Sequence, residues 1–543
     1  MENRIYNILK ELVAIGSLTD SKMEVVAEEA IFGMLSKMDY FIDNSDLLGM
    51  LPIEGDPHGR KLVYALVKGE TAKTVVLLSH HDVVGIEDYG FLKHLAFDIE
   101  ELENEIGKLD LNLDAKADLE SGEWIFGRGT ADMKAGLAIE LAIIEEYSKN
   151  PDKGSLLLLS VPDEESYSVG MRNASSFLCD LMEKYGLEYK LCINTEPNRR
   201  EDGKHIVPIG TGGKSLPVVL CQGEKAHVGM CFDGINSLGI MSEIFRNTEL
   251  NPEFSDEYMG EATMPPAWLY YKDQKNEYDV SLPLRTSGYI SILSFSTTAD
   301  EVITKLKAIA EQSFSDYVER VKVFQREYQR KLKRPGTAVL DYEAWVITFN
   351  ELVIYCRENI GEDFEKLYEN ILSEAGKSIA SGEANFPQAT IEIMNRVLDI
   401  SKITKPVVIV GFAPPYYPAA SSRKVPGRYG AIESYFDFLD TISKDKFDIG
   451  LIAEEYTVAL SDCSYCMIDK SFDFESFAKN TPMWGKLYNI AFKKIEQINM
   501  VSIIMGPWGK DYHQVTERVY KADVFERIPY LINELCKKAF KED

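Results

Sequence analysis

The sequence predicts an α/β fold with a mainly parallel sheet, interrupted by one large α+β insertion. Through the first two hundred residues, short apolar runs alternate with helical patterns, which is typical of a parallel sheet covered by helices. Between residues 213 and 425 such runs become few, and long charged helical patterns predominate. After residue 425, short apolar runs again alternate with helical patterns. We therefore expect one domain made of residues 1–212 and 426–543, with residues 213–425 inserted as a second domain. A chain of 543 residues is long enough for two or more cores.

The elements of the first domain follow from periodicity. The chain opens with an amphipathic helical pattern whose apolar side is formed by Ile5, Ile8, Leu9 and Leu12. Four short apolar runs predict the central strands: Thr74–Ser79, Leu156–Val161, Tyr189–Asn194 and Met500–Met505. Between the first two runs, Met133–Tyr147 predicts a helix with one buried face.

The insertion has a different pattern. Long charged helical stretches are expected at 300–333 and 350–376, and one apolar run, Val407–Phe412, predicts a strand. The segment Pro414–Pro418 (PPYYP) follows that run, and we interpret it as a turn-rich end to the strand. No internal repeat of 20–50 residues is evident.

Composition excludes several classes of protein. The 87 acidic and 59 basic residues give a net charge of -28 that is spread along the chain, which disfavours binding to nucleic acid or anionic membranes. The chain has no apolar stretch of roughly 18 residues and no signal-like start. Among 8 cysteines, only Cys463 and Cys466 form a CxxC pair, so we expect reduced structural thiols. We expect a soluble cytoplasmic protein.

Metal-binding residue types follow each predicted central strand. The first run leads into His80-His81-Asp82, the second into Asp163-Glu164-Glu165, the third into Glu196 and the fourth toward His513, while Asp132 precedes the predicted buried helix. Ligands of open α/β sheets bind beyond the carboxyl ends of the strands. A single such carboxylate is most often a helix cap, and a single histidine is most often a packed or surface residue. Their coincidence indicates mixed nitrogen and oxygen metal positions that suit zinc.

These residues also carry a resemblance. Ser79–Val84 (SHHDVV), Gly127–Gly136 (GRGTADMKAG), Asp163–Glu165, Thr195–Pro197 and His513–Glu517 resemble, in order and rough spacing, five motifs of the M20 metallopeptidase family. The resemblance covers about 1–240 and 480–543 and implies a di-zinc catalytic domain of aminopeptidase or carboxypeptidase type with an inserted lid domain. The long middle and the late GPWGKDYHQVTERV segment are most similar to the M20 subgroup associated with arginine utilisation.

The resemblance assigns metal ligands. It implies that His80 and Glu196 hold one ion, that Glu165 and His513 hold the other, and that Asp132 bridges the two. Two Zn²⁺ are expected, and Co²⁺ or Mn²⁺ are alternatives. The adjacency of two glutamates in the third motif cannot by itself decide which of them is the ligand.

The resemblance also assigns catalytic roles. Glu164 would be the general base. Asp82 would orient the metal ligand His80 without itself binding the metal. His227, in a segment similar to the family's lid, would donate to the oxyanion, often from a partner subunit; its alternative is a surface histidine. The family's Asp-x-Arg lid signature, which grips a substrate carboxylate, is not apparent, and Arg285 is a guess at a substitute.

The sequence therefore predicts a hydrolase that cleaves an amide bond of a small amino-acid or peptide derivative with a metal-activated water. Peptidase, deacylase and carbamoylase activities stay open, although a glutamate, Glu196, in place of an aspartate resembles the carboxypeptidase and deacylase branches of the family more than the aminopeptidases. One alternative is a catalytically inactive relative that binds a ligand or partner, and the intact set of motif residues argues against it. A mononuclear structural zinc protein is a third alternative. The resemblance further implies a homodimer formed through the lid.

Overall fold

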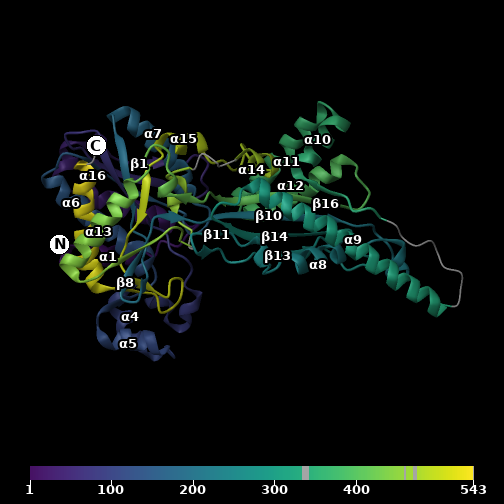
Figure 1. Cartoon of the computed structure of the whole chain (residues 1–543), viewed down its shortest axis with the longest axis horizontal. Coiled ribbons are helices and arrows are strands. Elements are labelled where there is room, and N and C mark those ends of the chain that lie inside the picture. The colour runs from purple at the N-terminus through teal and green to yellow at the C-terminus, as the bar shows by residue number, and fades with distance from the viewer. Residues whose placement is uncertain (333–341, 458–459, 469–473, 542–543) are drawn as a thin grey trace. The chain divides into compact units, whose positions relative to one another are not determined.

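The structure, a computed structural model, describes residues 1–332, 342–457, 460–468 and 474–541 (Figure 1). The chain forms two units. Unit 1 comprises Met1–Gly212, Pro418–Lys470 and Ile490–Asp543, and unit 2 comprises Gly213–Tyr417 and Ser471–Asn489. Residues 213–417 of the predicted insertion lie in unit 2, but its last residues, 418–425, lie in unit 1, and unit 2 also takes in a later segment of the chain.

The four predicted central strands lie together in the main sheet of unit 1. Its strands, in spatial order, are β1 (Leu48–Pro52), β2 (Lys61–Val67), β5 (Ser155–Val161), β3 (Lys73–His80), β6 (Glu188–Asn194) and β19 (Val501–Ile504). The last four are parallel, while β1 and β2 pair antiparallel at one edge. Because β3, β5 and β6 are buried almost throughout, they form the continuous apolar runs seen in the sequence. The predicted α/β class with a mainly parallel sheet is confirmed.

Helices pack around the sheets of unit 1. They are α1 (Glu2–Ile15), α2 (Met23–Leu35), α3 (Asp39–Asp43), α4 (Ile99–Glu105), α5 (Leu113–Ser121), α6 (Ala135–Lys149), α7 (Val169–Tyr185), α13 (Ala431–Phe447), α15 (Phe492–Ile498) and α16 (Ile528–Lys541). The predicted first helix buries its apolar side as expected. The predicted buried helix is α6, which begins after a π-type turn at Thr130–Lys134.

Three small sheets complete unit 1. They are β18 (Leu451–Glu454), β8 (Lys204–Pro208) and β7 (Arg200–Glu201); β20 (Gly509–Lys510), β21 (Arg518–Tyr520) and β4 (Trp124–Phe126); and β17 (Ala420–Ser421) with β9 (Gly210–Thr211). The second of these sheets joins the segment before Asp132 to the segment after His513. Two parts of the chain that are far apart in sequence are thereby tied together.

Unit 2 is a mixed sheet with helices. Its strands, in spatial order, are β13 (Ala267–Asp273), β14 (Arg285–Ser294), β10 (Gly213–Gln222), β16 (Val407–Tyr417) and β15 (Val346–Thr348), with a separate ribbon of β11 (Glu257–Tyr258) and β12 (Glu261–Ala262). Its helices are α8 (Ser237–Thr248), α9 (Ala299–Leu332), α10 (Phe349–Ile360), α11 (Asp363–Ala380), α12 (Phe386–Ser401) and α14 (Phe474–Asn480). The first of the two long charged patterns forms a single long helix, α9, and the second forms the pair α10 and α11.

The prediction that the strand after Val407 ends in a turn was wrong. Strand β16 continues through Pro414 and Pro415 to Tyr417 and is buried along its whole length. Its register with β10 shifts between the pairs Leu216–Ala413 and Lys214–Tyr417, so the prolines fall in the irregular stretch where no ladder N–H is needed. Buried β10, which was not among the predicted strands, provides the neighbour that keeps the segment extended.

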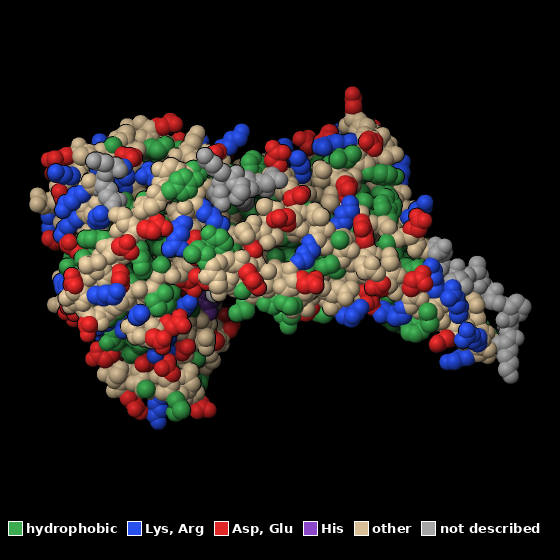
Figure 2. Space-filling model, viewed as in Figure 1, with side chains coloured by type: hydrophobic (Ala, Val, Ile, Leu, Met, Phe, Trp, Pro, Cys, Tyr) green, Lys and Arg blue, Asp and Glu red, His purple; other side chains and the backbone are tan. Residues whose placement is uncertain are grey.

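Charged side chains are interspersed over the visible face of each unit (Figure 2). Acidic and basic groups alternate there rather than gathering into one large patch of a single sign. This distribution agrees with an acidic excess spread along the sequence. Among the helices of the described ranges, none combines the length and the apolar character needed to cross a membrane.

Candidate metal centre

The sheet of unit 1 brings the predicted site residues to one edge. In the parallel ladders, His80 lies beside Val161 and Leu78 lies beside Asn194, so β3, β5 and β6 end at nearly the same level. The next residues of each strand must therefore leave the sheet at that edge. This explains why motifs separated by many residues in the sequence meet in space.

The first group of possible ligands surrounds His80. Its Nε2 atom lies 3.1 Å from Oδ1 of Asp132 and 3.4 Å from Oε1 of Glu196. On the other side of the ring, Nδ1 lies 3.4 Å from Oδ1 of Asp82 and 3.0 Å from the Asp82 carbonyl oxygen. One ring nitrogen, Nε2, thus faces two carboxylates. The other, Nδ1, contacts Asp82, which orients the ring.

The second group surrounds His513. Its Nε2 atom lies 3.0 Å from Oε1 of Glu165 and 3.3 Å from Oδ2 of Asp132. The two oxygens of Asp132 therefore face different histidines, Oδ1 toward His80 and Oδ2 toward His513. A carboxylate placed in this way can bridge two cations.

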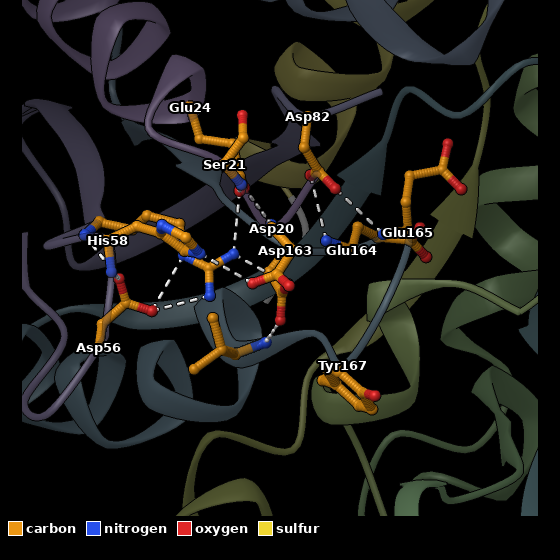
Figure 3. A network of polar contacts seen from close by, with 12 residues as sticks. Asp20, Ser21, Glu24, Asp56, His58, Asp82, Asp163, Glu164, Glu165 and Tyr167 are labelled. Carbon is orange, nitrogen blue, oxygen red and sulfur yellow. Dashed lines mark hydrogen bonds and ion pairs between the residues drawn. The ribbon is translucent and has the colours of Figure 1, made fainter. Parts of the chain in front are cut away.

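Asp82 also positions the turn that holds the two glutamates (Figure 3). Its carboxylate accepts the backbone N–H of Glu164 at 3.1 Å and that of Glu165 at 3.2 Å. Burial would raise the pKa of Asp82, but the hydrogen bond from His80 keeps it below its ordinary value. The Glu164 carboxylate lies within 4.8 Å of ligand atoms of His80 and Glu196.

Arg60 supports the same turn from the protein interior. Its Nη1 atom contacts Oδ1 of Asp163 and Oε1 of Glu24, both at 2.9 Å, and its Nη2 atom contacts Oδ1 of Asp56 at 2.7 Å. Glu24 in turn accepts the N–H of Asp163 at 2.9 Å. Asp163 has a φ of 68°, a left-handed conformation that a non-glycine residue adopts only when its surroundings hold it there.

A second buried ion pair supports Asp132. The carboxylate of Glu517 accepts the N–H groups of Ala131 at 3.2 Å and Asp132 at 3.3 Å, and its other oxygen binds Nη1 of Arg128 at 2.7 Å. Both side chains of the pair are at most 1% exposed. The motif residue Glu517, which lies on the same loop as His513, therefore holds the backbone of Asp132 in place.

Glu140 ties two strand ends together and was not predicted as a site residue. From helix α6 it accepts the hydroxyls of Ser79 at 2.8 Å and Thr195 at 2.9 Å, the residues immediately before His80 and Glu196. Burial raises the pKa of Glu140 to about 8. A glutamate inside an otherwise apolar helical face is the signal that could have identified it.

Asp462 is another residue that sequence reasoning missed. It is buried, and burial raises its pKa to about 7 against the opposing effects of the His80 charge and a hydrogen bond with Ser168. Its charge also acts on Glu164. No local pattern marks Asp462, because it reaches this place only through the return of the chain into unit 1.

The electrostatics of the group favour cations. Burial, together with the charge of Asp132, raises the pKa of Glu196 to about 8, and burial raises the pKa of Glu164 well above its ordinary value. Hydrogen bonds with Asp132 and Glu165 raise the pKa of His513 to about 10. A nearby positive charge stabilises the ionised form of buried carboxyl groups that repel one another. The donor set of imidazole nitrogens and carboxylate oxygens is the one that zinc and similar divalent ions take.

Two residues predicted from the resemblance belong to unit 2. His227 is exposed, and its Nδ1 accepts the N–H of Gly229 at 3.0 Å. Arg285 is engaged within unit 2 by Gln222 at 3.0 Å and by Asp399 at 2.7 Å. Their roles toward a substrate stay predictions.

Gly506 fits closely against the loop that bears Glu196. A Cβ atom at this position would overlap the carbonyl oxygens of Thr195 and Glu196, which are backbone atoms and cannot rotate away. We expect Gly506→Ala to displace Glu196 and to lower metal affinity by about 10–100-fold, the usual cost of disturbing a residue that orients a ligand. Competition with a chelating dye would measure the change.

A matched control is available in helix α2. A Cβ atom at Gly33 would meet nothing within 4 Å, so Gly33→Ala should leave metal affinity unchanged. Equal affinities for the two variants and the wild type would show that Gly506 does not position Glu196.

An α/β sheet whose strand ends gather paired histidines and acids is the arrangement expected of a metal-dependent hydrolase. The chain belongs to the Peptidase family M20/M25/M40, whose family model matches residues 77–533. The M20 membership predicted from the five motifs is confirmed.

Three similar proteins illustrate the family. The chain is 32% identical to uncharacterized protein YqjN of Bacillus subtilis (strain 168), covering 100% of this chain and 97% of the relative. It is 30% identical to protein RocB of the same organism, covering 98% and 94%. The crystal structure of the Bacillus subtilis YXEP protein, described as a dinuclear metal binding peptidase from the M20 family, superposes with a TM-score of 0.51 at 10% identity, covering 99% and 98%. That likeness shows the fold.

Proposed function

We propose that this protein is a two-metal hydrolase that cleaves the amide bond of a small amino-acid or peptide derivative. One observation supports the proposal above the others: the two carboxylate oxygens of Asp132 face two different histidines, at 3.1 Å and 3.3 Å. A structural site for a single ion would need no such bridge. Membership of a peptidase family and the dinuclear peptidase with the same fold favour the same conclusion.

The residues present fit two divalent cations. His80 and Glu196 would hold one, Glu165 and His513 the other, and Asp132 would be shared. When bound, two such ions lower the pKa of a shared water and polarise the carbonyl of the substrate. Zinc is the proposed resident metal, with Co²⁺ or Mn²⁺ as substitutes.

Glu164 is the proposed general base. Its carboxylate lies beside His80 and Glu196, and its N–H is held by Asp82, so the group is fixed next to the ligands. There it can accept a proton from water and pass it to the leaving amine. The positive charge of nearby cations would lower its burial-raised pKa and keep it ionised for this task.

The metal assignment is tested by counting ions. Wild-type protein should carry up to two zinc-like ions per chain, and Asp132→Ala should lower that number most, because both ions lose a ligand and the negative charge between them. Asp180→Ala changes an exposed aspartate of α7 and should leave the content unchanged. Elemental analysis that finds wild-type metal content in Asp132→Ala would contradict the bridging role.

The reaction class is tested with substrates. A panel of N-acyl amino acids, N-carbamoyl amino acids and dipeptides should include at least one compound that the wild type hydrolyses, and a chelator should abolish that activity until metal is restored. Full metal content without turnover of any amide would favour the alternative, an inactive relative that binds a ligand. The intact ligand set and Glu164 argue for the enzyme. A cytoplasmic location, a lid-mediated homodimer and a link to arginine utilisation stay predictions.

A further inference from the structure

Three cysteines meet inside unit 1, in a group separate from the histidines and acids above. The sulfur atoms of Cys192, Cys463 and Cys466 all lie within 4.8 Å of one another, and each residue is at most 1% exposed. All eight cysteines of the chain lie within the described residues and none forms a disulfide. The CxxC pair, expected from the sequence to be structural thiols, therefore gains a third thiol from a distant strand.

The fold assembles this group around strand β6. Cys192 and Asn194 are two residues apart on β6, so their side chains point to the same face of the sheet. The segment of the CxxC pair lies against that face, because the amide of Asn194 donates to the hydroxyl of Ser461 at 3.1 Å. Asn194 also accepts the N–H of Glu196 at 2.8 Å. Its side chain therefore connects the segment of the CxxC pair to the backbone of a candidate metal ligand.

The surroundings suit a negative charge at one of the three sulfurs, that of Cys463, whereas contacts with that thiol and burial keep the pKa values of Cys192 and Cys466 well above the ordinary value. Hydrogen bonds from the thiols of Cys192 and Cys466, then from the hydroxyls of Ser461 and Ser502, hold the pKa of Cys463 well below its ordinary value despite its burial. Ser502 lies directly beside Cys192 in the parallel ladder of β6 and β19. A buried thiolate without a cation is costly, so a positive ion would stabilise the Cys463 thiolate.

The spacing of the sulfurs fits a metal better than a disulfide. Sγ of Cys192 and Sγ of Cys466 are 3.8 Å apart. A disulfide would require about 2.05 Å. Metal–sulfur bonds of about 2.3 Å place sulfurs about 3.8–4.0 Å apart around a shared ion. This pair therefore has the spacing expected of two ligands of one ion, and the sulfur of Cys463 lies within 4.8 Å of both.

We propose that Cys192, Cys463 and Cys466 form a separate site for a thiophilic cation, and that three-coordinate Cu(I) fits it best. Soft thiolates select Cu(I) and zinc, but structural zinc takes four ligands. Among the described residues, no fourth His, Cys, Asp or Glu side chain joins this group. Three sulfurs in a site closed to solvent therefore favour the monovalent ion.

The test uses zinc-loaded, full-length protein and Cu(I) presented anaerobically as its complex with a coloured chelator. Wild type should withdraw one equivalent of copper. Cys463→Ser should weaken the binding by more than about 100-fold, since even a residue that only orients a ligand costs about 10–100-fold. Cys536→Ser replaces a buried cysteine of the same unit outside the group and should bind as wild type does. X-ray absorption of the copper-loaded wild type, which needs no variant, should show three sulfur neighbours.

Several outcomes would overturn the proposal. They are failure of the wild type to take up copper, equal binding by Cys463→Ser and Cys536→Ser, nitrogen or oxygen neighbours at the copper edge, and a disulfide between two of the three cysteines in protein as purified. An extra zinc ion held by the same three cysteines, with copper refused, would overturn the choice of ion. None of these results depends on hydrolytic activity, so the proposed function can fail or succeed independently.

Discussion

Replacing Glu164 by glutamine should lower kcat by about 10²–10⁴-fold while both metal ions stay bound, because general acid–base catalysis typically contributes that much. The amide keeps the size and hydrogen-bonding capacity of the carboxylate but cannot accept a proton. The backbone contact between the Glu164 N–H and Asp82 does not involve the changed atoms, so the turn should keep its shape. Steady-state kinetics and elemental analysis of the same preparation would measure both effects.

The neighbouring glutamate provides the contrast. Glu165 lies 3.0 Å from His513 and 7% of its side chain is exposed, so Glu165→Gln should instead lower metal content. Glu164→Gln losing metal while Glu165→Gln keeps it would mean that the two roles are reversed. If neither variant changes the hydrolysis of a substrate that the wild type cleaves, the two-metal mechanism is wrong.

Arg60→Met should lower the free energy of unfolding by about 3–5 kcal/mol, the usual cost of removing one partner from a buried ion pair. The guanidinium is 4% exposed and faces the carboxylates of Asp56 and Asp163. Burial raises the pKa of Glu24, its third partner, against the pull of the guanidinium. Urea unfolding followed by circular dichroism would measure the loss.

Arg4→Met is the matched control for Arg60→Met. Arg4 contacts Glu145 at 2.7 Å, but their side chains are 44% and 27% exposed, so losing the pair should cost at most about 1 kcal/mol. Arg60→Met should also displace the turn that bears Glu164 and Glu165 and so reduce activity at temperatures where the protein is still folded. Equal stability of the two variants would show that the buried network does not hold the turn.

The sequence predicted the elements that depend on local pattern. Strands β3, β5 and β6 are buried on both faces, so each appears as an unbroken apolar run, and the polar residue after each run necessarily lies at the sheet edge. This is why the candidate positions could be located from the sequence, whereas the choice of ligands among them came from the resemblance to the M20 family. Strand β16 was mistaken at its prolines because its continuation depends on pairing with β10, which local pattern cannot reveal.

The residues that support the site were harder to predict. Arg60, Glu140 and Asp462 act through partners that lie far away in the sequence, such as Asp163 at a separation of 103 residues from Arg60. A buried charged residue has no periodic signal of its own, and its partner is fixed only by the tertiary fold. The group of three thiols that includes Cys192 was missed for the same reason. A single CxxC pair does not indicate which distant cysteine will lie beside it in the fold.

The placement of His513 has a consequence for how the protein is made. Synthesis delivers the segment that carries His80, Asp132 and Glu165 long before the loop that carries His513 and Glu517. A nascent or truncated chain that stops before this loop lacks one histidine and the carboxylate that holds the backbone of Asp132. Such a chain also lacks the strand β21 that pairs with β4. On the proposed metal assignment, only chains synthesised past this loop should take up both ions, and shorter products should stay metal-poor and be open to proteolysis.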